Sequence, residues 1–275
     1  MKNALTPLLA ALSLFAGSAS ATTLVYNDFS SVAGLQLNGS AAQAGTALRV
    51  TPASSFQSGS AFSTTAVTLN SNVSFSSAFS FRITNSGGIS DGDGVGADGL
   101  TFTIQTVSNT AGGAGGGIGY QGILKSVGIE YDTYDNGSFG NDPDGNHVGI
   151  DLGGNIFSVQ TASVATRMNN GNVWYSWVDY DGTTDNLEIR LSQSSTRPLS
   201  ALLTRNVDLA TVLGTTNAFV GFTSGTGSAW GDHDILSWEF RDTFAPIGNV
   251  PEPASLALLG VALTGLAATK RRKAT

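Results

Sequence analysis

Short segments that alternate polar and apolar residues run through the middle of this chain, and turn residues separate them. Side chains along a strand point alternately to its two faces, so this period of two predicts strands with one buried face. We find no convincing amphipathic helix, and only residues 201–213 are compatible with a helical turn. The predicted strands are Leu35–Asn38, Ala47–Val50, Phe75–Ile83, Leu100–Ile104, Val127–Asp132, His147–Leu152, Val173–Tyr180, Leu187–Leu191, Phe219–Thr223 and Ile235–Phe240, with residues 180–186 as a hairpin connection. Many strands without intervening helices predict an all-β fold, an antiparallel β-sandwich or jelly roll.

The two ends of the chain are not part of this β domain. Residues 1–21 combine Lys2, an apolar run and the small residues Ala19 to Ala21, which together predict a secretory signal peptide. Residues 256–268 form a second apolar run, which is shorter than the ~20 residues that a membrane-spanning helix needs. A basic cluster at 270–273 follows it, and the plain interpretation is a short tail anchor with that cluster on the cytoplasmic side. Residues 22–245 remain as a single β domain.

The C-terminal tail, residues 250–275, resembles the bacterial PEP-CTERM sorting signal. Val250-Pro251-Glu252-Pro253, the apolar run and the terminal basic cluster match that signal in order. The resemblance implies recognition by an exosortase, transient membrane association through the tail, and export to the cell surface or extracellular matrix of a Gram-negative bacterium.

The β domain is strongly acidic. Of 13 basic and 20 acidic residues, five basic and one acidic lie in the two ends, which leaves 8 − 19 = −11 for the domain. Nucleic acid is therefore not expected as a partner, because phosphate binding needs a basic face. The chain has no cysteine, so this exported protein depends on its core rather than on disulfides.

Residues 128–147 concentrate acidic side chains around one basic neighbour, Lys125. Charges of one sign packed this closely repel each other unless a cation lies among them. The segment begins as a strand and continues as a glycine-rich loop. Carboxylate, amide and carbonyl oxygens suit calcium, whereas a histidine among carboxylates suits manganese or another transition metal. The pattern predicts a cradle for two adjacent divalent cations, with ligands from Glu130, Asp132, Tyr134, Asn136, Asp142 and His147.

The same residues resemble the metal-binding segment of the legume lectins. The matching pattern is Glu130-x-Asp132-x-Tyr134-x-Asn136, followed by an Asp-Pro pair and by His147. Other motifs follow in family order through the domain: Gly59-Ser-Ala-Phe, Ala97-Asp-Gly-Leu, Gly115-Gly-Gly-Ile-Gly, Val148-Gly-Ile-Asp, Val220-Gly-Phe-Thr and His233-Asp-Ile-Leu-Ser-Trp-Glu-Phe. This L-type lectin family consists of jelly-roll sandwiches of the concanavalin A-like fold, which bind sugars. The resemblance implies a lectin without catalytic activity.

The resemblance also implies which of these ligands bind each of the two metal ions. Glu130, Asp132, Asp142 and His147 would surround the transition metal, Mn²⁺ or a similar ion. Asp132, Asp142, the Asn136 amide and the Tyr134 carbonyl would surround Ca²⁺. One extra residue between Asn136 and Asp142, relative to the tightest family spacing, implies a bulged calcium loop.

The sugar is expected on a shallow surface beside the metals. The resemblance implies that Asp98 accepts hydrogen bonds from sugar hydroxyls and that the Gly116 backbone N–H and the Asn136 amide donate them. It implies a cis Ala97–Asp98 peptide, held by calcium through water. An aromatic ring usually stacks on the apolar face of the sugar, and by position it is expected near Tyr134, with Tyr120 and Trp230 as the other candidates.

Several features fit this pattern less well or carry weaker signals. The serine that the family uses through water, beyond the histidine, has no clear equivalent, because Phe157 comes first and Ser158 follows. The glycine run 112–119 predicts a flexible hairpin tip or a backbone that approaches a ligand closely. Asp91-Gly-Asp93-Gly predicts a solvated loop, and His233 a residue of packing and hydrogen bonding.

Two other functions remain open from the sequence. Glu130-x-Asp132-x-x-Asp135 resembles the carboxylate strand of jelly-roll glycoside hydrolases, in which two carboxyl groups ~5–5.5 Å apart act with retention. The third acid is Asp rather than Glu here, and catalysis leaves Asn136, Asp142 and His147 unexplained. A matrix or adhesion protein that keeps the sandwich without binding sugar is the second alternative. The sequence identifies neither the sugar nor the oligomeric state.

Overall fold

The computed structural model describes residues 23–70, 72–112 and 117–248. The predicted signal peptide and sorting tail lie outside the described residues, as does Gly116. The strands are β1 (Thr23–Tyr26), β2 (Leu35–Gly39), β3 (Ala42–Ala44), β4 (Ala47–Thr51), β5 (Ser58–Ser63), β6 (Val67–Thr68), β7 (Phe75–Gly88), β8 (Ser90–Asp91), β9 (Gly94–Val95), β10 (Gly99–Gln105), β11 (Ser126–Asp132), β12 (His147–Leu152), β13 (Gln160–Ser163), β14 (Trp174–Asp181), β15 (Asn186–Ser192), β16 (Leu203–Asn206), β17 (Asn217–Gly225) and β18 (Ala229–Arg241).

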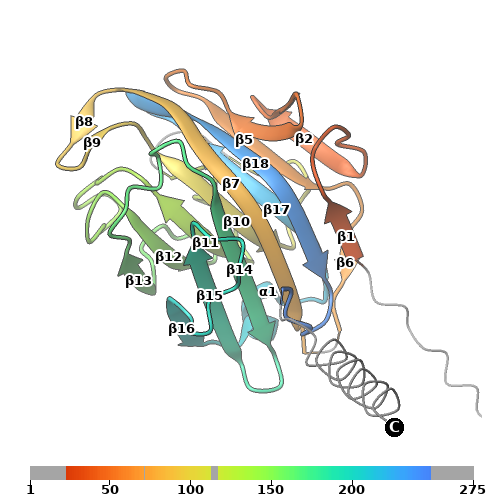
Figure 1. Ribbon diagram of the computed structural model, residues 1–275. Coiled ribbons are helices and arrows are strands. Elements are labelled where there is room, and N and C mark those ends of the chain that lie inside the picture. Colours follow the sequence, from red (N-terminus) through yellow and green to blue (C-terminus); the bar gives the residue numbers. More distant parts are fainter. Residues whose placement is uncertain (1–22, 71, 113–116, 249–275) are drawn as a thin grey trace, which may run out of the picture.

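Two large antiparallel sheets form the sandwich (Figure 1). The first sheet has the order β16-β15-β14-β7-β18-β4-β3, with β1 paired to β18. The second sheet has the order β13-β12-β11-β10-β17-β5-β2, with β6 paired to β17. Consecutive strands form hairpins at the margins of the sheets, whereas pairs such as β7–β18 and β10–β17 come from distant parts of the chain, which is the crossover pattern of a jelly roll. The predicted all-β jelly-roll sandwich is confirmed.

Aromatic side chains fill the space between the sheets. Every second residue of β7 faces inward, and Phe75, Phe79 and Phe81 are buried there. Phe79 meets Phe222 of the second sheet edge-on, with ring centroids 5.0 Å apart. It also meets Tyr131 edge-on at 5.6 Å. Edge-on aromatic pairs add to the stabilisation from area burial alone, so this core fixes the second sheet against the first.

Strands β10 and β11 are buried on both faces, which sets them apart from half-buried strands at the sheet margins. Their outer face carries small or polar residues that a loop covers. At Gly128 a Cβ atom would lie 2.8 Å from the ring of Tyr120, so this loop packs directly on the strand. The predicted metal-binding segment, residues 128–147, therefore begins on a covered strand and continues into a loop at its end.

All ten predicted strands are present, with ends shifted by a few residues. The predicted helical turn is the five-residue helix α1 (Leu209–Leu213), which begins at the cap Asp208. The strands that the sequence did not predict are short or rich in small residues, so they show little alternation. Among the described residues no helix is long and apolar enough to cross a membrane.

Candidate functional site

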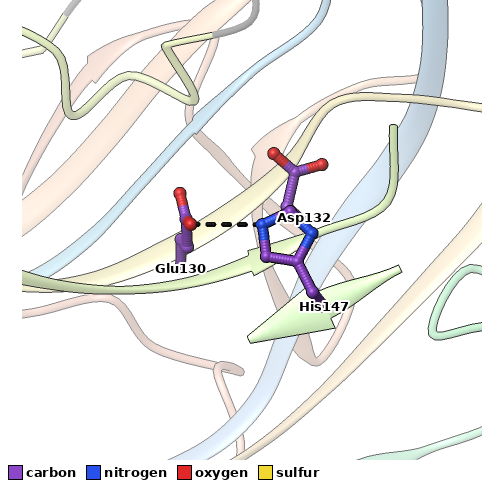
Figure 2. Close-up of side chains that lie close together, drawn as sticks. All are labelled: Glu130, Asp132 and His147. Atoms are coloured by element: carbon purple, nitrogen blue, oxygen red, sulfur yellow. Dashed lines mark ion pairs between the residues drawn. The ribbon is translucent and has the colours of Figure 1, made fainter. Parts of the chain in front are cut away.

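Three neighbouring strands of the second sheet bring the predicted metal ligands to one end of the sandwich. Asp132 at the end of β11 lies opposite Gly99 of β10 on one side and opposite His147 of β12 on the other. Glu130 shares a face of β11 with Asp132, because side chains repeat every two residues in a strand. Figure 2 shows these acidic side chains and the His147 ring gathered in one place, from β11 and β12 respectively.

The His147 ring directs its Nε2 atom toward the carboxylates of Glu130 and Asp132. Its Nδ1 lies 3.0 Å from the Asp144 carbonyl oxygen, which can only accept, so Nδ1 carries the hydrogen. The other nitrogen, Nε2, lies 3.3 Å from Glu130 Oε1 but has no hydrogen-bond partner. One ligand atom from each of Glu130, Asp132 and His147 falls within 4.8 Å of the others. A metal-binding histidine usually donates its second ring N–H to a carbonyl or carboxylate, as His147 does here.

The charge of this cluster is poorly compensated by the protein itself. Burial, followed by the charges of Glu130 and Asp142, raises the pKa of Asp132 well above its ordinary value. Burial raises the pKa of Asp142 to about 6, although the Asn136 N–H opposes the rise. Burial by itself lowers the pKa of His147, but the adjacent Glu130 carboxylate raises it above its ordinary value. A cation at this point would stabilise the ionised carboxylates, as a bound metal does in general.

Two hydrogen bonds fold the loop after β11 back onto the cluster. The Tyr134 backbone N–H donates to Asp132 Oδ1 at 2.7 Å, and the Asn136 N–H donates to Asp142 Oδ2 at 2.7 Å. The structure therefore brings all six predicted ligand residues to one region. Glu130, Asp132 and His147 form the compact group, while Tyr134, Asn136 and Asp142 join it through the loop. Carboxylate, carbonyl, amide and imidazole donors of this kind fit Ca²⁺ together with a transition metal.

Ser158 and Asp151 complete the site. The Ser158 hydroxyl lies 2.7 Å from Glu130 Oε1 and 2.6 Å from Asp151 Oδ1. The serine for which the sequence showed no clear equivalent is therefore placed at the cluster. Burial, with the charge of Glu130 next, raises the pKa of Asp151 well above its ordinary value. Strand periodicity could have found Asp151, because it lies on the same face of β12 as His147.

Gly149 on β12 makes this packing possible. It pairs with Glu130 across the ladder. A Cβ atom at Gly149 would lie 2.1 Å from Ser158 Oγ and 2.2 Å from Glu130 Oε1, which is closer than any real contact. Glycine therefore leaves the room that the Glu130 carboxylate occupies.

Asp98 lies beside the cluster, directly before β10. The Ala97–Asp98 peptide is cis, as the resemblance implied. The Asp98 side chain is buried, and its Oδ2 has no hydrogen-bond partner among the described residues. Burial, and then the charge of Asp142, raises the pKa of Asp98 to about 7. An unpaired, buried acceptor at the rim is suited to a ligand that donates hydroxyl hydrogen bonds.

A buried hydrogen-bond chain ends at the carbonyl of Gly99, the residue after Asp98. Ser224 Oγ donates to the Gly99 carbonyl at 2.7 Å, so it accepts from the Thr51 hydroxyl at 2.7 Å. Thr51 Oγ1 in turn accepts from His233 Nδ1 at 2.8 Å. Burial lowers the pKa of His233 to about 3, so the ring is neutral. The prediction that His233 serves packing and hydrogen bonding is confirmed.

The three candidate aromatic residues have different environments. Tyr134 is partly exposed, and burial, followed by the charges of Asp91 and Asp98, raises the pKa of its phenol, so the phenol lies near these two carboxylates. Tyr120 is buried, and its hydroxyl lies 3.2 Å from the Asp151 carbonyl inside the protein. The Trp230 ring packs on β7, where a Cβ atom on Gly87 would lie 2.9 Å from its Nε1. Tyr120 therefore offers no face for stacking, whereas Tyr134 and Trp230 are both partly exposed.

The Asp91–Gly94 segment is exposed to solvent at Gly92 and Asp93, in agreement with the solvated loop that the sequence predicted. It forms the turn of the β8–β9 hairpin, and Asp91 Oδ2 accepts the Asp135 backbone N–H at 2.8 Å. Arg167 holds the hairpin from the other side by donating to the Asp93 carbonyl. The hairpin thus contacts the loop after β11 at Asp135, between Tyr134 and Asn136.

Comparison with known proteins agrees with this architecture. The family model of the legume lectin domain matches residues 21–254, and that of the PEP-CTERM protein-sorting motif matches residues 249–273. The L-type lectin-domain containing receptor kinase VIII.1 of Arabidopsis thaliana is 36% identical over 177 residues. That alignment covers 62% of this chain and 24% of the kinase, so the chain spans about a quarter of the length of this curated relative.

Solved plant lectins have the same fold. Lectin II from Ulex europaeus has a TM-score of 0.66 and 26% identity over 80% of this chain and 97% of its own. A winged bean acidic lectin, solved in complex with methyl α-D-galactose, has a TM-score of 0.68 and 26% identity over 81% and 98% of the two chains. The legume lectin model spans most of the sequence, and the paired sheets and the acidic cluster lie within it. This chain therefore belongs to the legume lectin family.

Proposed function

We propose that this protein is a lectin that binds glycans, without catalysing a reaction, on the surface beside Asp98. The observation that carries the proposal is the unpaired Asp98 Oδ2 next to the cluster of Glu130, Asp132 and His147. Membership of the legume lectin family supports carbohydrate binding in general. The winged bean relative binds a galactoside, which makes galactosides a reasonable first class of ligand to test.

Each site residue has a proposed role in this surface. Asp98 accepts hydrogen bonds from sugar hydroxyls, while the Asn136 amide and the Gly116 N–H donate them. Tyr134 offers its partly exposed ring to the apolar face of the sugar. Bound Ca²⁺ and Mn²⁺, or another transition metal, would neutralise the carboxylates and fix the loop that carries Tyr134 and Asn136. Glu130, Asp132, Asp142 and His147 would hold the transition metal, and Asp132, Asp142, Asn136 and the Tyr134 carbonyl the calcium.

The two alternative functions have less support. A hydrolase would need Glu130, Asp132 and Asp135 on one strand, but β11 ends at Asp132 and Asp135 is an exposed loop residue. Asp135 also accepts the Gly137 N–H at 2.7 Å, which serves the turn. A matrix protein without sugar binding would not explain why a buried acceptor at Asp98 remains unpaired.

The sorting motif implies export and association with the cell surface. We propose further that an exosortase of a Gram-negative bacterium removes the tail and that the lectin acts at the surface or in the extracellular matrix. Glycans of a polysaccharide or glycoprotein would then be its partners. An oligomeric form would raise its avidity, because linked sites bind multivalent glycans more tightly.

A glycan array tests the function directly. Residues 22–245 of the wild type and of Asp98→Asn are compared with calcium and manganese present. We expect the wild type to bind a defined set of glycans and Asp98→Asn to lose them while its melting temperature stays close to that of the wild type. No binding by the wild type to any glycan would contradict the proposal, and equal binding by Asp98→Asn would remove Asp98 from the site.

A further inference from the structure

Phe56 has an unusual combination of exposure and backbone conformation. Its side chain is 72% exposed, and its φ of 56° lies in the left-handed region. Glycine adopts this region readily, whereas a bulky residue there is an outlier. A single exposed phenylalanine needs no special explanation. A bulky apolar residue in a strained backbone position does, because such strain is concentrated at functional sites.

The loop that carries Phe56 is fixed to the loop after β17. The Phe56 N–H donates to the Gly227 carbonyl at 3.0 Å. The Gln57 N–H donates to Thr226 Oγ1 at 2.8 Å, and the Thr226 N–H returns a bond to the Gln57 carbonyl at 3.0 Å. Thr226 Oγ1 also donates to the Ser54 carbonyl at 2.7 Å. The two loops therefore form one unit, and the conformation of Phe56 is imposed by four hydrogen bonds around it.

This unit borders the proposed sugar surface. A Cβ atom on Gly227 would lie 3.7 Å from Asp98 Oδ2, the unpaired acceptor. The residue that accepts the Phe56 N–H is therefore next to the atom proposed to bind sugar. On the other side of the same loop, the Ile89 N–H donates to the Ser228 carbonyl at 3.3 Å, and the Ile89 side chain is 53% exposed. Two exposed apolar side chains thus flank the loop at Asp98.

We propose that Phe56 is the platform of a second carbohydrate subsite, adjacent to the one at Asp98. The ligand is then an oligosaccharide of at least two residues, of which one binds at Asp98 and the next lies on the Phe56 ring. This inference rests on the proposed function. An aromatic ring offers a flat apolar face, and its packing against the C–H face of a pyranose removes apolar area from water. Core packing is not its role, since most of the side chain is in solvent.

The test compares monosaccharides with longer glycans by calorimetry. The probes are the methyl glycosides of galactose, N-acetylgalactosamine, fucose, glucose and mannose, and di- and trisaccharides that contain the monosaccharide that binds. The variants are Phe56→Gly and Phe56→Trp. Phe244→Ala is the matched control, because Phe244 is 47% exposed but follows the opposite end of β18. Melting curves are recorded for all of them.

We expect the wild type to bind the best oligosaccharide more tightly than its monosaccharide. Phe56→Gly should lower the oligosaccharide affinity about three- to tenfold and leave the monosaccharide affinity unchanged, because one aromatic contact is lost. Phe56→Trp should retain the preference, and Phe244→Ala should behave as the wild type. The melting temperature of Phe56→Gly should stay within about 4 °C of the wild type, because glycine suits this backbone position.

Three results would overturn the inference. Equal losses of monosaccharide and oligosaccharide affinity in Phe56→Gly would mean that Phe56 acts only through the shape of the loop. Unchanged oligosaccharide affinity in that variant would mean that Phe56 does not touch the ligand. A wild type that binds monosaccharides and oligosaccharides equally would have no second subsite. A wild type that binds none of the probes would contradict the proposed lectin function itself, and with it the second subsite.

Discussion

Replacing Asp132 with Asn should make the protein more stable than the wild type when metal is absent and less stable than the wild type when metal is bound. In the metal-free state Asp132 is 2% exposed and surrounded by other acids, so burial and neighbouring charge raise its pKa well above the ordinary value. A carboxyl whose pKa is higher in the folded than in the unfolded state lowers the free energy of unfolding at every pH above its unfolded-state pKa, and pH 7 lies in that range. Asparagine removes that charge and keeps an oxygen for the Tyr134 N–H, which Asp132 Oδ1 accepts at 2.7 Å.

The size of the effect follows from two opposing contributions. Burial and the charges of the neighbouring acids make the ionised Asp132 unfavourable in the absence of metal, so Asp132→Asn should raise the melting temperature in EDTA by a few degrees. Calcium at a hundredfold excess over Kd stabilises the native wild type by ~2.7 kcal/mol, or roughly 5–10 °C for a domain of this size. Asp132→Asn should lose most of that gain, because Asp132 would contact both ions.

Differential scanning fluorimetry at pH 7 measures both quantities. The wild type and Asp132→Asn are melted in EDTA and in excess calcium with manganese, and Asp181→Asn, an acid on the far β14–β15 turn, serves as the control. We expect Asp132→Asn to be the more stable of the two in EDTA and the less stable with metal. A full metal shift in Asp132→Asn would refute the assignment of the cradle, and a lower melting temperature in EDTA would refute the electrostatic reasoning.

Three further predictions follow from individual residues. Gly149→Ala should lose the metal-induced rise in melting temperature, because its Cβ would collide with Glu130 and Ser158; a normal metal shift in fluorimetry would contradict this. Burial lowers the pKa of His233 to about 3, below the unfolded 6.5, so the native state excludes a proton that the unfolded chain binds. His233 should therefore make the free energy of unfolding fall by ~1.4 kcal/mol per pH unit as the pH drops from about 6 to 4. Urea titrations should show a smaller slope in His233→Asn. An equal slope in the wild type and in His233→Asn would contradict the burial of a neutral His233. Mass spectrometry of the surface-exported protein should find residues 256–275 removed, and their retention would favour a plain tail anchor.

The strands that the sequence predicted are those whose two faces differ in chemistry. Phe75–Ile83 has mostly large apolar residues on one face and mostly serine and alanine on the other, and its inward phenylalanines belong to the core. Ser58–Ser63 and Gln160–Ser163 consist mainly of small or polar residues, so the burial of one face leaves little trace in them. The first of these strands pairs with β2 and β17, and the second with β12.

The acidic cluster could be predicted because its spacing follows the strand period. Glu130 and Asp132 are two residues apart, and their pairing partners Gly149 and His147 mirror that spacing on β12. The contacts made across long stretches of chain could not be predicted. Asp91 meets the backbone of Asp135 44 residues later, and composition gives no indication of that contact. The inward direction of Tyr120 likewise depends on its packing against Gly128, which only the folded chain determines.

The most direct test of the central claim is calcium-dependent recovery of sugar binding. The protein is stripped of metal with EDTA and dialysed, and binding of a glycan identified on the array is measured by calorimetry as calcium and manganese are added back. We predict no measurable binding without metal, full recovery in the wild type, and no recovery in Asp132→Asn at the same metal concentrations. Strong glycan binding by the metal-free wild type would contradict the claim that the Glu130–Asp132–His147 cluster organises the sugar site.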